Sequence, residues 1–179
     1  MSQAEFQRNY FELFDLPVGF EVDQQQLGTR YRQAQGELHP DRYAGASAHE
    51  QRLAVQYSAL INQAYATLRT PLSRAIYLLE LRGISQQELT SQPVDGAFLI
   101  MQMELREKLE TSADLMDPEP VLEHLIAEIS QDIAAEQARF GSSWVAEEFT
   151  RASSACIKMQ YLDKLLREAE QTEANLLEK

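Results

Sequence analysis

The sequence lacks the features that direct a chain out of the cytoplasm or into a membrane. It has a single cysteine, Cys156, and no apolar run that approaches the roughly 18 residues needed to span a bilayer. Its first residues, MSQAEFQRNYF, have neither the basic flank, the apolar stretch nor the small-residue cleavage site of a signal peptide. Because one cysteine cannot form an internal disulfide, we expect a soluble cytoplasmic protein with no membrane partner.

Basic residues are scarce in the second part of the chain. The net charge is -12, and residues 76–179 carry nine Lys or Arg against twenty Asp or Glu, whereas residues 1–75 carry seven against eight. An acidic excess of this size repels phosphate backbones, so we expect no nucleic-acid partner. A local basic patch could lie in the nearly balanced N-terminal part, where arginine is the only basic residue.

Motifs for catalysis or metal binding are also missing. The sequence contains no G-x-S-x-G or H-E-x-x-H pattern, and no cysteine lies near its three histidines. A hydrolase that used His39 and Asp41 would have no nucleophile, and a zinc site usually needs three or four ligands where these residues supply two. Taken alone, the tripeptide His39-Pro40-Asp41 favours a simple helix stop with solvated side chains. We expect no enzyme activity, no metal and no cofactor.

What the sequence does contain is apolar spacing typical of helices along almost its whole length, which predicts an all-α fold. Asn9 and Asp23 are placed to cap the first two helices, and Pro40 stops the second. Ser47 begins an S-x-x-E capping box that starts a third helix, and a fourth ends at Gly83. Because the connection between them is short, the second and third helices are predicted to form an antiparallel hairpin.

The helical spacing of apolar residues stops at residues 83–96, where two glycines and a proline indicate a domain boundary. Beyond it, DPEP at 117–120 and FG at 140–141 separate three long helical patterns, expected at residues 96–116, 119–140 and 144–177. A three-helix bundle is the simplest way to bury three such stripes. The predicted domains are residues 1–83, the hairpin with flanking short helices, and residues 84–179, the bundle.

Several segments together resemble a known family. NYFELFDLP at 9–17, HPDR at 39–42 and INQAYATLRTPLSRA at 61–75 resemble a J-domain, the module with which co-chaperones stimulate the ATPase of DnaK-class chaperones. RAIYLLELRG at 74–83, AFLIMQMELREKLE at 97–110 and YLDKLL at 161–166 are similar to the HscB co-chaperones of iron-sulfur cluster assembly. The resemblance covers nearly the whole chain.

The resemblance implies a chaperone-binding site in the first domain. His39, Pro40 and Asp41 would dock onto an ATP-bound DnaK-class chaperone of the HscA type and trigger hydrolysis. The basic residues that would steer this contact are Arg30, Arg32 and Arg42. At about 100° per residue, Arg30 and Arg32 lie about 200° apart on a helical wheel, so they cannot both face one partner squarely.

The segment FLIMQMELREKLE, residues 98–110, carries more apolar residues than one core stripe needs. At about 100° per residue, one arc collects Phe98, Met101, Leu105 and Leu109. The other side carries apolar residues beside two acids: Leu99, Ile100, Met103, Glu104 and Glu107. An apolar patch rimmed by charge is typical of a binding surface, and the alternative is a helix buried on two sides.

The resemblance implies that this second face binds the scaffold protein on which iron-sulfur clusters are built, a protein of the IscU type. The corresponding residues are Leu99, Ile100, Met103, Glu104, Glu107 and Tyr161, and Thr111 falls where some relatives have another acid. Cys156 lies in an apolar stripe and is predicted to be buried, and a cluster needs about four ligands. Two other functions stay open: a J-domain co-chaperone for other clients, and a helical adaptor without a chaperone partner.

Overall fold

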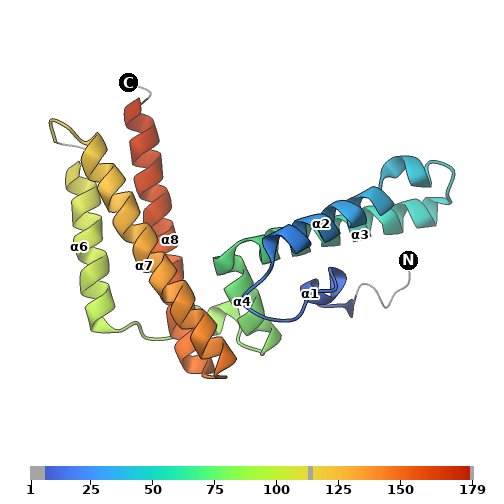
Figure 1. Cartoon of the computed structure of the whole chain (residues 1–179), viewed down its shortest axis with the longest axis horizontal. Coiled ribbons are helices and arrows are strands. Elements are labelled where there is room, and N and C mark those ends of the chain that lie inside the picture. Colours follow the sequence, from blue (N-terminus) through green and yellow to red (C-terminus); the bar gives the residue numbers. More distant parts are fainter. Residues whose placement is uncertain (1–6, 113–114, 178–179) are drawn as a thin grey trace. The chain divides into compact units, whose positions relative to one another are not determined.

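The computed structural model describes residues 7–112 and 115–177, and every regular element in these ranges is a helix (Figure 1). The predicted all-α fold is therefore confirmed for the described residues. The elements in chain order are α1 (Tyr10–Leu13), α2 (Gln24–Glu37), the 3-10 helix η2 (Pro40–Tyr43), α3 (Ala48–Arg69), α4 (Pro71–Leu81), α5 (Gln86–Ser91), α6 (Gly96–Ser112), α7 (Glu119–Val145) and α8 (Phe149–Leu177). The chain divides into two compact units, Met1–Leu78 and Leu79–Lys179.

The first unit starts its helices where the sequence predicted. Asn9 caps α1 in a reciprocal capping box, in which its side chain accepts the Glu12 N–H at 3.0 Å and its own N–H donates to the Glu12 carboxylate at 2.9 Å. Asp23 caps α2 by accepting the N–H groups of Gln25 and Gln26. These side chains satisfy amides that have no partner within the first helical turn.

Helices α2 and α3 form the predicted antiparallel hairpin (Figure 1). The ring of Tyr31 stacks on that of Tyr65 with centroids 3.9 Å apart, and the Tyr31 hydroxyl donates to Asn62 Oδ1 at 3.0 Å. Helix α2 ends at Glu37, and Ser47 starts α3 through the predicted capping box. The short loop between them is thereby held at the tip of the hairpin.

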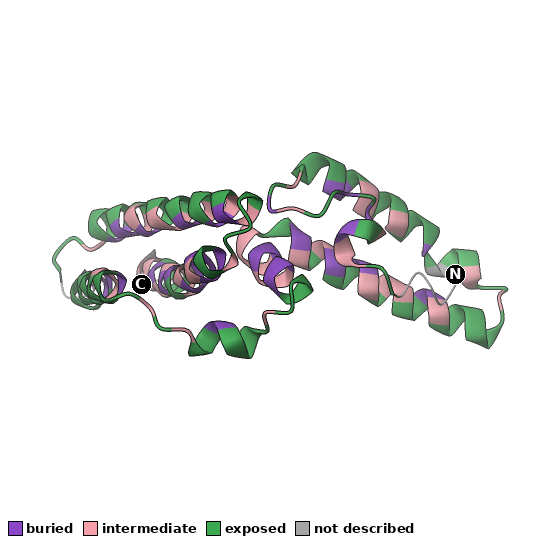
Figure 2. Ribbon diagram, turned by 90° about the horizontal axis from the view of Figure 1, so that it is seen from below, coloured by how far each residue is buried: buried purple, intermediate pink, exposed green. Residues whose placement is uncertain are grey.

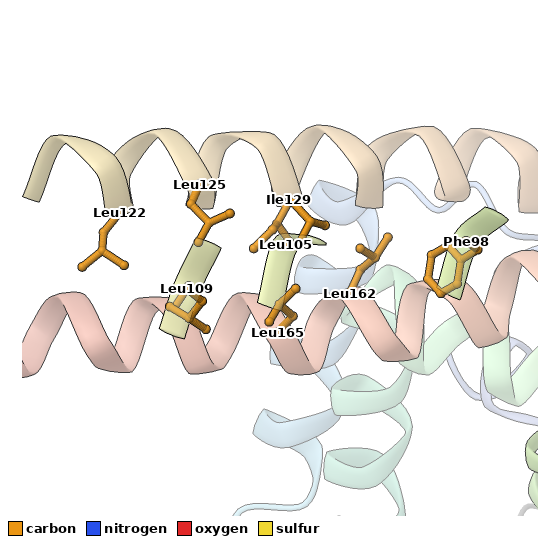
Figure 3. Packing of buried hydrophobic residues seen from close by; sticks show 9 residues of the cluster. Phe98, Leu105, Leu109, Leu122, Leu125, Ile129, Leu162 and Leu165 are labelled. Atoms are coloured by element: carbon orange, nitrogen blue, oxygen red, sulfur yellow. The ribbon is translucent and has the colours of Figure 1, made fainter. Parts of the chain in front are cut away.

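Helices α6, α7 and α8 form the predicted three-helix bundle. Buried apolar side chains from all three helices meet in its core (Figure 3): Phe98, Leu105, Leu109, Leu122, Leu125, Ile129, Leu162, Leu165 and Ala169. Buried stripes alternate with exposed ones along the long helices, which is the amphipathic pattern read from the sequence (Figure 2). Within residues 7–112 and 115–177, no helix combines the length and the apolar character that a bilayer span requires.

The segment 83–96 holds a helix that the apolar spacing did not predict. Ser85 caps α5 by accepting the Glu88 N–H at 3.2 Å, and the Glu88 carboxylate accepts the Ser85 N–H at 2.7 Å. One buried side chain, Leu89, anchors this short helix. A single apolar residue shows no periodicity, so the only local signal was the S-x-x-E spacing of Ser85 and Glu88.

The predicted helix stop at Phe140-Gly141 is wrong, because α7 continues through both residues to Val145. Phe140 is fully buried, so continuing the helix keeps its ring in the core. The helix ends instead where Glu147 adopts a φ of 58° and its N–H donates to the Trp144 carbonyl at 3.1 Å. The Glu148 N–H then donates to the Ser143 carbonyl at 2.9 Å, which completes a Schellman motif with glutamate in the position usually taken by glycine.

Candidate functional sites

The hairpin tip carries His39, Pro40 and Asp41, which we call the knuckle. The Leu38 N–H donates to the carbonyls of α2, and the Arg42 N–H donates to the His39 carbonyl at 3.0 Å, so the backbone on both sides is fixed. His39 Nδ1 lies 3.4 Å from both the N–H and the carboxylate Oδ2 of Asp41. The side chains of His39 and Asp41 are nevertheless 60% and 90% exposed, so both are available to a partner.

The knuckle presents two exposed polar side chains on a backbone held by hydrogen bonds. The side chains of His39 and Asp41 contact each other, and the carbonyls of both residues accept N–H groups of η2 and of Ala44. Among the described residues, no group of three or more His, Cys, Asp or Glu side chains is placed to hold a metal ion. Short polar side chains on a fixed backbone suit docking, because little conformational freedom is left to lose on binding.

The arginines near the knuckle differ in their placement. Arg32 lines a hollow that also includes His39, and its guanidinium donates to Thr29 Oγ1 at 3.3 Å. Arg30 lines a different hollow and pairs with Asp15 at 3.6 Å. The two arginines therefore face different sides of α2, as the helical wheel predicts. Arg42, within η2, is exposed directly after the knuckle.

The second site is the outer face of α6, formed by Leu99, Ile100, Met103, Glu104 and Glu107. Its apolar members are 39%, 61% and 68% exposed in that order, and both acids are exposed. Within the bundle, this face is therefore not covered by α7 or α8. Exposed apolar side chains grouped on one helix face are a frequent mark of a protein-binding surface.

Tyr161 of α8 lies next to the first turn of α6. Its ring meets the ring of buried Phe98 edge-on, with centroids 6.1 Å apart, and 42% of Tyr161 stays exposed. The first turn of α6 is capped by Asp95, whose carboxylate accepts the Phe98 N–H at 2.8 Å. The structure thus brings the predicted aromatic of α8 to the start of the α6 outer face, through Phe98.

Two ion pairs flank the α6 outer face, and within residues 7–112 and 115–177 neither Glu104 nor Glu107 takes part in one. Arg106 binds Glu168 of α8 at 2.7 Å, and Lys108 binds Glu128 of α7 at 2.8 Å. Thr111 does not extend the acidic edge, because its hydroxyl donates to a carbonyl of its own helix. The face is therefore apolar at its start and acidic further along.

Cys156 is buried, as predicted, and belongs to neither exposed surface. It has no exposed surface, and burial raises the pKa of its thiol to about 12. A thiol in this environment stays protonated at neutral pH, whereas an iron-sulfur cluster is held by thiolates. Cys156 is a residue of the bundle core.

An antiparallel helical hairpin with His-Pro-Asp at its tip, followed by a helical bundle, is the architecture of a J-domain co-chaperone. The family model described as the HSCB C-terminal oligomerisation domain matches residues 94–170. The chain is 42% identical over 168 residues to the co-chaperone protein HscB homolog of Shewanella loihica. The aligned region covers 92% of this chain and 97% of that relative.

Solved structures agree with the sequence comparison. Chaperone HscB from Vibrio cholerae is 38% identical, with a TM-score of 0.84 over 94% of this chain and 99% of that chain. Human co-chaperone protein HscB is 33% identical, with a TM-score of 0.84 over 92% of this chain and 81% of that chain. The chain belongs to the HscB co-chaperone family.

Proposed function

We propose that this protein is a cytoplasmic co-chaperone of iron-sulfur cluster assembly that catalyses no reaction itself. Its N-terminal domain, residues 1–83, stimulates the ATPase of a DnaK-class chaperone of the HscA type. Its C-terminal domain, residues 84–179, binds the cluster scaffold protein of the IscU type and delivers it to that chaperone. The cluster is cargo on the scaffold and is not bound by this chain.

The chaperone contact is assigned to the knuckle, with Arg32 and Arg42 beside it. The support is the fixed backbone, the exposure of His39 and Asp41, and the hollow that Arg32 and His39 share. Positive charge near the knuckle steers an acidic partner surface toward it. Arg30, paired with Asp15 on another side of α2, has a smaller part in this contact.

The scaffold contact is assigned to the α6 outer face and Tyr161. The observation that carries this assignment is the exposure of Leu99, Ile100 and Met103 on a helix whose opposite side already fills the core. Covering such side chains releases free energy in proportion to the apolar area removed from water. Glu104 and Glu107 add a preference for a partner with basic residues at the matching edge.

The steady-state ATPase of the chaperone tests both contacts in one experiment. We expect the full chain to stimulate hydrolysis, the addition of scaffold to raise the rate further, and His39→Gln to abolish the stimulation while still binding scaffold. If the full chain gives no stimulation, the J-domain function fails and a helical adaptor without a chaperone partner becomes the better description. Stimulation that does not respond to scaffold would favour a co-chaperone for other clients.

A second use of the α6 outer face is suggested by the matched family model, which is described as an oligomerisation domain. An exposed apolar face could equally be covered by another copy of the chain. Sedimentation velocity of the wild type and of the variant with Leu99, Ile100 and Met103 replaced by alanine separates the two uses. A wild-type monomer supports scaffold binding, and a dimer that the triple replacement disperses supports self-association.

A further inference from the structure

Asp95 joins two interactions at the start of α6. One carboxylate oxygen, Oδ1, accepts the Phe98 N–H at 2.8 Å and caps the helix. The other, Oδ2, lies 2.5 Å from Lys158 Nζ on α8. Lys158 and the Phe98 N–H hold the pKa of Asp95 below its ordinary value, so this carboxyl is ionised at neutral pH.

Lys158 is well covered for a lysine, with 15% of its side chain exposed, whereas 51% of the Asp95 side chain is exposed. Its ammonium lies 5.4 Å from the centre of the Phe98 ring, and Tyr161, one turn further along α8, meets the same ring edge-on. Asp95 and Lys158 thus contact each other and Phe98, and Tyr161 contacts the Phe98 ring. We call these four residues the α6 anchor.

The anchor lies where the two parts of the proposed scaffold surface meet. Leu99 and Ile100 directly follow Phe98 on α6, whereas Tyr161 belongs to α8. The two parts can act as one surface only if the first turn of α6 keeps its place against α8.

The other ion pairs of α6 are weaker constraints on that first turn. Arg106 and Glu168 are 44% and 38% exposed, Lys108 and Glu128 are 51% and 37% exposed, and both pairs join later turns of the helix. All three pairs are charge-assisted, and solvent screens exposed charges, so the pair of Lys158, the best covered member of the three pairs, is screened least on its basic side.

We propose that the ion pair between Asp95 and Lys158 positions the first turn of α6 against α8, so that Leu99, Ile100 and Tyr161 present one continuous surface to the scaffold protein. This inference rests on the proposed function and adds two positioning residues to it. Neither residue has to touch the scaffold, because they act through Phe98 and the cap of α6.

Four variants separate the ion pair from the cap and from general stability. Asp95→Asn keeps a side chain that caps helices as well as aspartate does, but removes the ion pair. Lys158→Met removes the same pair from the other side, and Lys158→Arg restores a positive charge. Glu136→Gln is the matched control: Glu136 belongs to α7, pairs with Arg139, and interacts with Lys158 and Asp95 through its charge.

Calorimetric titration of purified scaffold protein into each full-length variant measures the effect on binding. We expect Asp95→Asn and Lys158→Met each to weaken binding about fivefold, with the double variant no weaker than either single one. Lys158→Arg and Glu136→Gln should bind within about twofold of the wild type. Wild-type affinity in both single variants overturns the proposal, and so does an equal loss in Glu136→Gln.

The free protein provides a readout that does not depend on the scaffold. In methyl-labelled protein, the NMR signals of Leu99, Ile100 and Met103 should shift in Asp95→Asn and Lys158→Met and stay in place in Glu136→Gln. Unchanged signals in both variants overturn the positioning role. If the wild type itself does not bind scaffold, the proposed function fails, and the methyl signals still decide whether the anchor orients this face.

Discussion

Replacing Leu99, Ile100 and Met103 together by alanine tests the α6 outer face directly. Because these side chains are 39%, 61% and 68% exposed, the core loses little when they are shortened. We expect the free energy of unfolding to fall by less than about 1 kcal/mol. Leu105 is the matched control on the same helix, and at 1% exposure its replacement by alanine should cost about 2 to 5 kcal/mol.

The effect on binding follows from the exposed fractions. Burying a whole Leu, Ile or Met side chain is worth about 1.5 to 3 kcal/mol. The exposed parts of the three residues together amount to somewhat less than two whole side chains. If the scaffold covers them, the triple variant should lose about 3 kcal/mol of binding free energy, which weakens the dissociation constant by about a hundredfold.

Two measurements decide the outcome. Isothermal titration calorimetry gives the affinity for the scaffold protein, and chemical denaturation followed by circular dichroism gives the stability of the triple variant and of Leu105→Ala. An unchanged affinity with an intact fold would refute the assignment of this surface. A loss of stability as large as that of Leu105→Ala would show instead that the three residues belong to a core.

Three single sites yield further expected outcomes. Glu147 holds a φ of 58° that favours glycine, so Glu147→Gly should stabilise the fold by about 0.5 to 1 kcal/mol in denaturant titration, and destabilisation would contradict the helix end described here. Burial raises the pKa of Cys156 to about 12, so a disulfide reagent should label it only on unfolding, and fast labelling of native protein would contradict its burial. Burial also raises the pKa of Glu136, although Arg139 opposes the shift. The folded state therefore binds this proton more tightly than the unfolded chain, and the ionised carboxylate costs stability at higher pH. Glu136→Gln should raise the melting temperature at neutral pH but not at acidic pH, and a lower value at neutral pH would show that the pair with Arg139 dominates.

The features that the sequence predicted are those coded by neighbouring residues. Asn9, Asp23 and Ser47 cap the helices they were expected to cap, because a capping side chain bonds to amides two or three residues away. The knuckle is equally local, since a proline directly after a helix forces the chain out of the α region. The exposed side of α6 was also predictable, because helical periodicity alone separates Leu99 from Leu105.

The features that the sequence did not predict depend on contacts between distant residues. The dipeptide Phe140-Gly141 is a local signal for a helix end. The burial of the Phe140 ring in the core instead keeps the chain helical through Gly141 to Val145. The ion pair between Asp95 and Lys158 joins two helices, and only the position of Asp95 just before a predicted helix hinted at its capping role. Long-range pairing of this kind is set by tertiary packing, which local propensities do not contain.

Charge decides which partner suits the α6 outer face. The two basic residues of α6, Arg106 and Lys108, are already paired with Glu168 and Glu128. Glu104 and Glu107 therefore give the face a negative edge beside its apolar start. A second copy would carry the same acidic edge with its own α6 cations already paired, so it would add negative charge to the interface without complementing it. A different protein with a basic edge gains both the apolar contact and the charge pairing, which is the chemistry expected of the proposed scaffold partner.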